Sequence, residues 1–179
     1  MIMKKLVMTL VAAVIAVSAS AQVYLGGGIG FSSVKIKGAD AETTFKFLPE
    51  VGYNIDDSWA VGMVIGYSKG APMAFNNSVT ETFAVNPYVR YTALKTKYVN
   101  LFCDGTVGYA SVKDEGSVYE FGIKPGLAVN LNEHFSFVTH VGFFGYNLID
   151  PKADGVKNSS QFGLNLDGSN ITFGVYYNF

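Results

Sequence analysis

The chain has 179 residues, of which 49% are hydrophobic and 15% aromatic, and its formal net charge is −1. This nearly neutral balance provides no basic surface, so it gives no reason to expect a nucleic-acid partner. The one cysteine, Cys103, cannot form an internal disulfide. We therefore expect burial and backbone pairing to hold the fold together.

The first 21 residues have the pattern of a secretory signal peptide. Two lysines come first, an uncharged apolar run covers Leu6–Val17, and small residues precede Gln22. This order of basic head, short apolar core and small-residue site is typical of exported precursors. A membrane anchor is the alternative, but the run is too short for a spanning helix, which needs about 20 residues. We expect cleavage between Ala21 and Gln22, which leaves a single domain over 22–179.

The rest of the chain alternates with a period of two residues, and no segment keeps a helical period. The last stretch is the clearest, because Ile171–Phe179 alternates between bulky apolar and smaller, more polar residues. Such alternation predicts strands that are half-buried. The pattern predicts eight strands in all: Val23–Ser32, Phe45–Tyr53, Trp59–Ser68, Thr82–Thr92, Tyr98–Val112, Tyr119–Asn130, Phe135–Leu148 and Ile171–Phe179.

The predicted connections alternate between short turns and longer loops. The short, polar ones are Asn54–Ser58, Lys95–Lys97 and Leu131–His134. The others are Ser33–Glu42, Gly70–Ser78, Asp114–Ser117 and Asp150–Ser169, and all but the third are long. Short turns at one end and long loops at the other are typical of transmembrane barrels, whose longer loops lie outside the cell.

The two faces of the predicted strands differ in charge and size. One face is bulky, apolar and nearly free of charge, whereas the other collects glycine, small residues and charges. An eight-stranded barrel has an interior just wide enough for side chains, so the bulky face would overfill it. We therefore predict a closed, antiparallel, up-and-down transmembrane barrel that turns its bulky face to the lipid.

Six charges fall on the predicted lumen face, three basic and three acidic. They are Lys46, Glu50, Arg90, Asp104, Glu120 and Lys124. A charge that faces hydrocarbon costs roughly 2–4 kcal/mol near the membrane midplane, so we expect these groups to form an ion-pair network inside the barrel. The network would act either as a selectivity filter or as a polar plug. The narrow interior of eight strands favours the plug.

Three prolines interrupt the predicted ladder of backbone hydrogen bonds. Pro49, Pro87 and Pro125 each lie within a strand, and proline has no N–H to donate to a neighbouring strand. We expect β-bulges at these three positions.

Seven stretches carry a recognisable pattern: Val23–Gly30, Phe45–Asn54, Trp59–Gly62, Ile65–Tyr67, Pro87–Tyr91, Gly122–Leu127 and Tyr176–Phe179. Together they resemble the outer-membrane β-barrel (porin-like) family that is abundant in Bacteroidetes, with a fold similar to the OmpA and OmpX barrels. The resemblance implies a location in the cell outer membrane of a Gram-negative bacterium. It also implies that Phe179, with Tyr177 on the same face, is the signal that the barrel-assembly machinery reads. Outer-membrane lipid and lipopolysaccharide are then the expected surroundings, and a closed barrel needs no second copy to satisfy its edges, so we expect a monomer.

The sequence contains few candidates for catalysis or for a cofactor. Gly26–Gly30 lacks the spacing and the lysine of a phosphate-binding loop, and His134 and His140 have no ligand cluster around them. A lipid A-modifying barrel would need a serine beside a histidine at the outer rim, and no such pairing is evident. We expect no cofactor, no metal and no enzyme. Three functions stay open, in this order: a structural or surface-interaction barrel, a narrow pore or small-solute transporter, and a lipid A-modifying enzyme.

Overall fold

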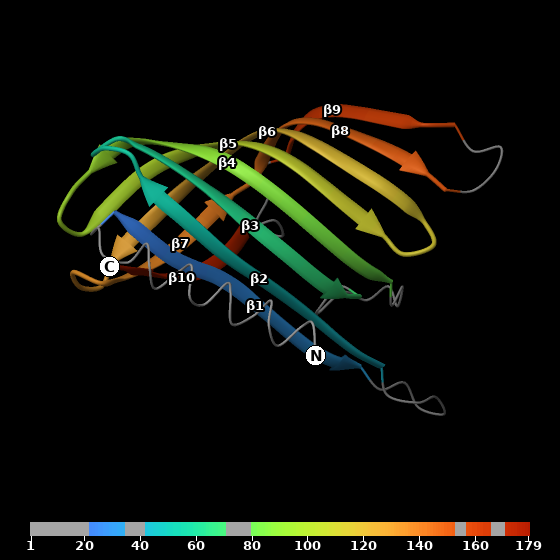
Figure 1. Cartoon of the computed structure of the whole chain (residues 1–179), viewed down its shortest axis with the longest axis horizontal. Coiled ribbons are helices and arrows are strands. Elements are labelled where there is room, and N and C mark those ends of the chain that lie inside the picture. The colour runs from blue at the N-terminus through green and yellow to red at the C-terminus, as the bar shows by residue number, and fades with distance from the viewer. Residues whose placement is uncertain (1–21, 35–41, 71–79, 153–156, 166–170) are drawn as a thin grey trace, which may run out of the picture.

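The computed structural model describes residues 22–34, 42–70, 80–152, 157–165 and 171–179 (Figure 1). The predicted signal segment, including Ala21, lies outside them. The strands are β1 Val23–Val34, β2 Glu42–Asn54, β3 Trp59–Lys69, β4 Glu81–Lys95, β5 Val99–Val112, β6 Gly116–Asn130, β7 Phe135–Val141, β8 Phe143–Pro151, β9 Ser159–Asn165 and β10 Ile171–Asn178. None of the described residues forms a helix long and apolar enough to cross a bilayer.

These ten strands build an eight-stranded antiparallel barrel, as predicted. β1 to β6 follow one another around the wall, and β6 then pairs with β7 over one half of its length and with β8 over the other. β7 pairs with β10, and β10 pairs with β1, which closes the ring. β7 with β8 and β9 with β10 therefore each form one interrupted barrel strand. We call the end that carries the short turns the inner end and the opposite one the outer end (Figure 1).

The interruption between β7 and β8 is a bulge opposite Pro125. Gly126 pairs with His140 but Ile123 pairs with Phe144, so the second strand carries one extra residue. Gly142 lies in this extra segment with φ 75°, a left-handed conformation that favours glycine. A bulge therefore does lie at the third proline, although the extra residue is on the neighbouring strand.

The expectation of bulges at Pro49 and Pro87 was wrong. The register of β1 and β3 against β2 is unchanged across Pro49, and that of β3 and β5 against β4 is unchanged across Pro87. A one-residue shift would turn every following side chain to the wrong face. The loss of one backbone hydrogen bond at each proline disturbs the barrel less than such a register shift would.

β9 was predicted to be part of a loop, Asp150–Ser169, and this was wrong. It pairs with β8 over seven residues, from Phe143 opposite Asn165 to Ile149 opposite Ser159. The sequence signal was short, because only Phe162 and Leu164 alternate with the small and polar residues of this segment. All seven residues of β9 are exposed.

The buried apolar core lies inside the barrel, in its inner half. It consists of Tyr24, Ala60, Tyr88, Phe102, Ala128, Val138 and Tyr176. The buried polar residues are Glu50, Arg90, Asp104, Thr106 and Ser136. The bulky residues on the other face of the strands are exposed, as the inverted arrangement of a membrane barrel requires.

Glycines make room for the rings inside this core. Gly62 lies opposite Tyr88 in the β3–β4 register, and a Cβ added to Gly62 would stand 2.4 Å from the Cζ of Tyr88. The same relationship holds in three more register pairs: Gly52 with Tyr24, Gly26 with Tyr176, and Gly126 with Phe102. Each ring therefore lies over a glycine of the adjacent strand, and the narrow lumen can accept four large rings.

Candidate functional site in the lumen

The centre of the lumen is occupied by an ion pair between adjacent strands. Arg90 on β4 faces Asp104 on β5, and its Nε and Nη2 donate hydrogen bonds of 2.7 and 2.8 Å to the two carboxylate oxygens. Both residues are buried, with 7% and 3% of their surface exposed. Two parallel bonds of this kind fix the guanidinium and the carboxylate in one plane.

Glu50 on β2 is the second acid of this group. The hydroxyls of Tyr88 and Tyr176 both donate to its Oε1, the latter over 2.6 Å, and Arg90 Nη2 lies 3.6 Å from the same oxygen. The hydroxyl of Tyr24 shares a hydrogen bond of 2.6 Å with that of Tyr88. A buried carboxylate needs such donors, because an unpaired charge in a dry interior is strongly unfavourable.

Four aromatic rings surround the Arg90 guanidinium. Its Cζ lies 3.9 Å from the ring centroid of Phe102 and 5.1 to 5.6 Å from those of Tyr88, Tyr176 and Tyr24. Cations within about 6 Å of a ring face are attracted to it. The rings therefore stabilise the charge of Arg90 and fill the cross-section around it.

His140 completes the group from β7. Its Nε2 lies 2.8 Å from Oδ2 of Asp104, and its ring meets that of Phe102 edge-on. We call these residues together the plug: Tyr24, Glu50, Tyr88, Arg90, Phe102, Asp104, His140 and Tyr176.

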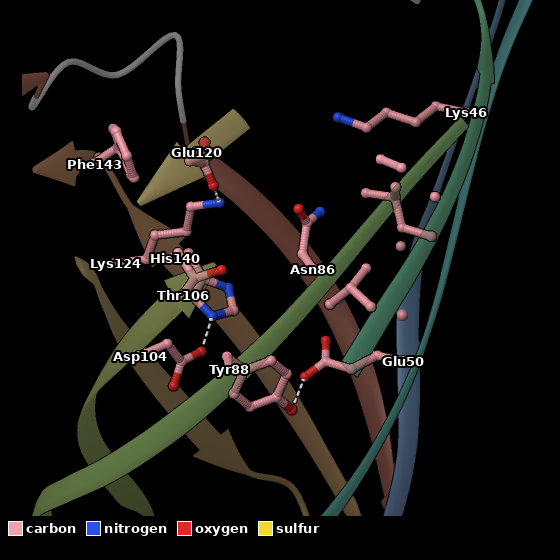
Figure 2. Close-up of a pocket in the computed structure, with 18 of the residues that line it drawn as sticks. Lys46, Glu50, Asn86, Tyr88, Asp104, Thr106, Glu120, Lys124, His140 and Phe143 are labelled. Atoms are coloured by element: carbon pink, nitrogen blue, oxygen red, sulfur yellow. Dashed lines mark hydrogen bonds and ion pairs between the residues drawn. The ribbon is translucent and has the colours of Figure 1, made fainter. Parts of the chain in front are cut away.

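The plug separates two cavities. The outer vestibule has a volume of about 650 Å³, and plug residues Glu50, Tyr88, Asp104, His140 and Tyr176 are among those that line it (Figure 2). The inner vestibule, of about 800 Å³, is lined by the turns and strand ends of the inner end. Of the residues that the structure describes, none lines both cavities.

The six predicted lumen charges separate into three groups. Glu50, Arg90 and Asp104 lie in the plug. Closer to the outer end, Lys124 donates a hydrogen bond of 2.6 Å to Glu120, and its Nζ lies 5.5 Å from the ring centroid of Phe143. Lys46 points into the outer vestibule (Figure 2) and forms no ion pair with any residue that the structure describes. A single continuous network of all six is therefore not what the described residues form.

The sequence reasoning assigned no role to the rings of the plug. Tyr24, Tyr88, Phe102 and Tyr176 are bulky residues on a face otherwise made of small and polar ones. This exception could have been noticed in the sequence, because a large ring inside a narrow barrel needs a small residue, such as glycine, on the adjacent strand. His140 lies within the predicted strand Phe135–Leu148, but its contact with Asp104 depends on the register across three strands.

The remaining predicted residues lie at the inner end. The Tyr53 hydroxyl donates to Oε1 of Gln22, and Phe179 N donates to the carbonyl of Val23 over 3.1 Å. The rings of Tyr177 and Phe179 meet edge-on at 4.9 Å. His134, in the last short turn, contacts the carbonyl of Asn178 through Nδ1 at 3.0 Å. Within the described part of the chain, no three metal-binding side chains converge.

A family profile described as "Outer membrane protein beta-barrel domain" matches residues 6–179. The chain belongs to this family. As an outer-membrane barrel, it turns the bulky face of its strands outward and encloses the plug. This family membership confirms the predicted location in the outer membrane.

One solved structure agrees on the fold, and a second is similar at a lower TM-score. The crystal structure of Neisserial surface protein A (NspA) superposes with a TM-score of 0.50 at 16% identity, covering 89% of this chain and 98% of that one. The outer membrane protein OprG from Pseudomonas aeruginosa gives a TM-score of 0.48 at 18% identity, covering 89% and 97%. A comparison with curated proteins gave no significant match. At these identities the likeness concerns the fold of a small outer-membrane barrel.

Proposed function

We propose that this chain is a non-conducting outer-membrane barrel with a structural or surface-interaction role, which presents its outer vestibule and outer loops to the exterior. The observation that carries this proposal is the plug. Eight buried or half-buried side chains from β1, β2, β4, β5, β7 and β10 meet at one level of the lumen, and the two vestibules lie on opposite sides of them.

The energetics of the plug support a permanently closed lumen. Arg90 is held by Asp104, Glu50 and four rings at once, so moving it would leave two buried carboxylates without their partner. Separating one partner from a buried pair costs about 3–5 kcal/mol. That cost opposes spontaneous opening to ions.

A narrow pore is the second candidate, and a specific feature favours it. Only one layer of side chains lies between two large vestibules, so a modest change in that layer would join them. A lipid-modifying enzyme has less support. The contacts of the two histidines are Asp104 for His140 and a backbone carbonyl for His134, and neither is a nucleophile.

The surroundings of the barrel follow from the same proposal. Outer-membrane lipid and lipopolysaccharide would cover the exposed apolar face, and the barrel-assembly machinery would insert the chain by way of Phe179 and Tyr177. We propose a monomer without a cofactor. Origin in Bacteroidetes and cleavage after Ala21 remain predictions from the sequence.

Conductance in planar bilayers tests the proposal. The wild-type barrel should give no steady ion current, whereas Tyr88→Ala combined with Tyr176→Ala should open a path beside Arg90 and give one. Lys95→Ala, in the inner turns, is the matched control and should stay silent. Unheated gel mobility must first show that each variant is folded. A steady wild-type current would overturn the closed barrel in favour of the pore.

A further inference from the structure

Among the described residues, strand pairing is interrupted on one side of the barrel's outer half. β10 pairs with β1 over only four positions, ending where Gly27 meets Val175. β9 pairs with β8 on one side. Among the described residues, the outer half of β1 and the whole of β9 therefore form two facing edges, and Figure 1 shows β8 and β9 diverging from β1 at the outer end. In a bilayer, open strand edges are tolerated only beside protein or a cavity.

The side chains along these edges are unusually exposed and apolar. Ile29 on β1 is 86% exposed, Phe162 and Leu164 on β9 are 69% and 61%, and Phe173 on β10 is 59%. The other exposed large apolar residues in the described strands range from 37% to 53%. An apolar patch of this kind marks a binding site more often than scattered exposed residues do.

The outer vestibule extends to the same edges. Gly27 and Gly28 of β1, Leu164 of β9 and Phe173 of β10 line it, and so does Leu48 of β2, the register partner of Gly28. Gly27 and Gly28 themselves contribute no side chain between the cavity and the outside of the barrel. The cavity therefore has one apolar side that faces the lipid.

The vestibule also has a polar lining, which includes one cation without an ion-pair partner among the described residues. Lys46 points into the cavity from β2, opposite the Glu120–Lys124 pair, with Asn86 between them (Figure 2). Asn147 and Gln161 add further amides to the lining. Glu120 already pairs with Lys124, whereas Lys46 has no ion-pair partner among the described residues. Lysine is a common partner of phosphate and carboxylate groups.

We propose that the outer vestibule binds an anionic amphiphile from the outer leaflet, with its charged head at Lys46 and its alkyl chain leaving between β1 and β9. The chain would run past Leu48 and Phe173 to the exposed edge residues. This inference rests on the proposed closed lumen. Because the plug closes the inner side of the vestibule, the gap between β1 and β9 is the apolar path by which an alkyl chain can leave it. A volume of about 650 Å³ lies in the usual range of small-molecule sites.

Native mass spectrometry of the full barrel in dodecyl maltoside micelles tests the proposal, with dodecyl phosphate as the probe. The neutral detergent has the same alkyl chain, so preferential binding of the probe reports the charged head. Wild-type protein should retain one dodecyl phosphate. Lys46→Gln should weaken its binding about tenfold, which is about 1.4 kcal/mol. The control Lys95→Gln should leave it unchanged.

Two further measurements separate the head from the chain. Inorganic phosphate should displace dodecyl phosphate poorly. The double variant Leu164→Ser with Phe173→Ser should bind dodecyl phosphate more weakly and bind inorganic phosphate as wild type does. The matched control is Val61→Ser with Phe83→Ser, two lipid-facing residues away from the edges, and it should bind as wild type does. Absence of a retained adduct, equal binding by Lys46→Gln, or equal competition by inorganic phosphate would each overturn the amphiphile site. A steady current with the adduct retained would instead refute the closed lumen and leave the site standing.

Discussion

Arg90 and Asp104 stand directly opposite each other in the β4–β5 register and share two hydrogen bonds, although 14 positions separate them in the chain. Their strands are joined by a short turn at the inner end, so the pair can form as soon as this hairpin does. Glu50 and His140 then approach from more distant strands. The plug is therefore a local pair completed by the closure of the barrel.

Replacing Arg90 by alanine should destabilise the barrel strongly. Asp104 and Glu50 would be left as buried carboxylates without their cation, a loss of about 3–5 kcal/mol for a buried pair. The midpoint of urea unfolding, followed by heat-dependent gel mobility, measures the change. The control is Lys95→Ala, which breaks an exposed pair with Asp57 and should change the midpoint far less, because exposed pairs contribute little to stability. An unchanged midpoint for Arg90→Ala would mean that Arg90 does not stabilise the plug.

A methyl group at Gly62 should disturb the plug through Tyr88. The added Cβ would stand 2.4 Å from a ring that is also bonded to Glu50 and Tyr24, and overpacking of this kind typically costs about 1–3 kcal/mol. Gly163→Ala is the matched control, because its added Cβ meets nothing within 4 Å. Equal unfolding midpoints for the two alanine variants would argue against a ring fixed over Gly62.

Phe179→Ala should impair assembly more than it impairs stability. The ring contacts Tyr177 at the edge of the barrel, so few internal contacts are lost, whereas the proposed assembly signal disappears. The amount of folded protein in outer-membrane fractions should fall several-fold, and the unfolding midpoint of the protein that does fold should change little. Val175→Ala, on the same strand and 51% exposed, should assemble normally. Normal membrane levels of Phe179→Ala would remove this residue from the signal.

The inner turn after β2 should carry an aspartate with a low pKa. Lys95 Nζ donates to Asp57 over 2.6 Å, and this hydrogen bond, followed by the charge of the ammonium, lowers the pKa of the Asp57 carboxyl below its ordinary value. Because the folded pKa is depressed, the small stabilisation is present above the ordinary aspartate pKa of about 3.9 and is lost as the pH falls through the lower, folded value. A carbon-detected NMR titration of Asp57 measures it. In Lys95→Gln the pKa should return toward the ordinary value, and a pKa that does not move would contradict the pair.

Much of the architecture could be predicted because the strands carry their pattern locally. A strand that faces lipid on one side and a crowded lumen on the other must alternate, so Trp59–Ser68 or Ile171–Phe179 can be recognised without any knowledge of their neighbours. The inverted faces also follow from composition, since a bulky face cannot fit inside eight strands. β9 was missed because its alternation rests on two residues. The position of the extra residue near Gly142, on the strand next to Pro125, was missed because the residues on either side of it keep a period of two.

The sequence by itself determined which face of each strand enters the lumen, and therefore which charges must find partners there. Only the tertiary structure decided the pairs, because pairing depends on the register between strands. Arg90 meets Asp104 directly, and Glu50 is reached through the hydroxyls of Tyr88 and Tyr176. Lys46 has only Gly30 and Ser68 as register neighbours, so its ammonium stays without an acidic partner among the described residues. The physical reason is that a side chain's face follows from the two-residue period of its own strand, whereas its neighbours follow from how eight strands are staggered when the barrel closes.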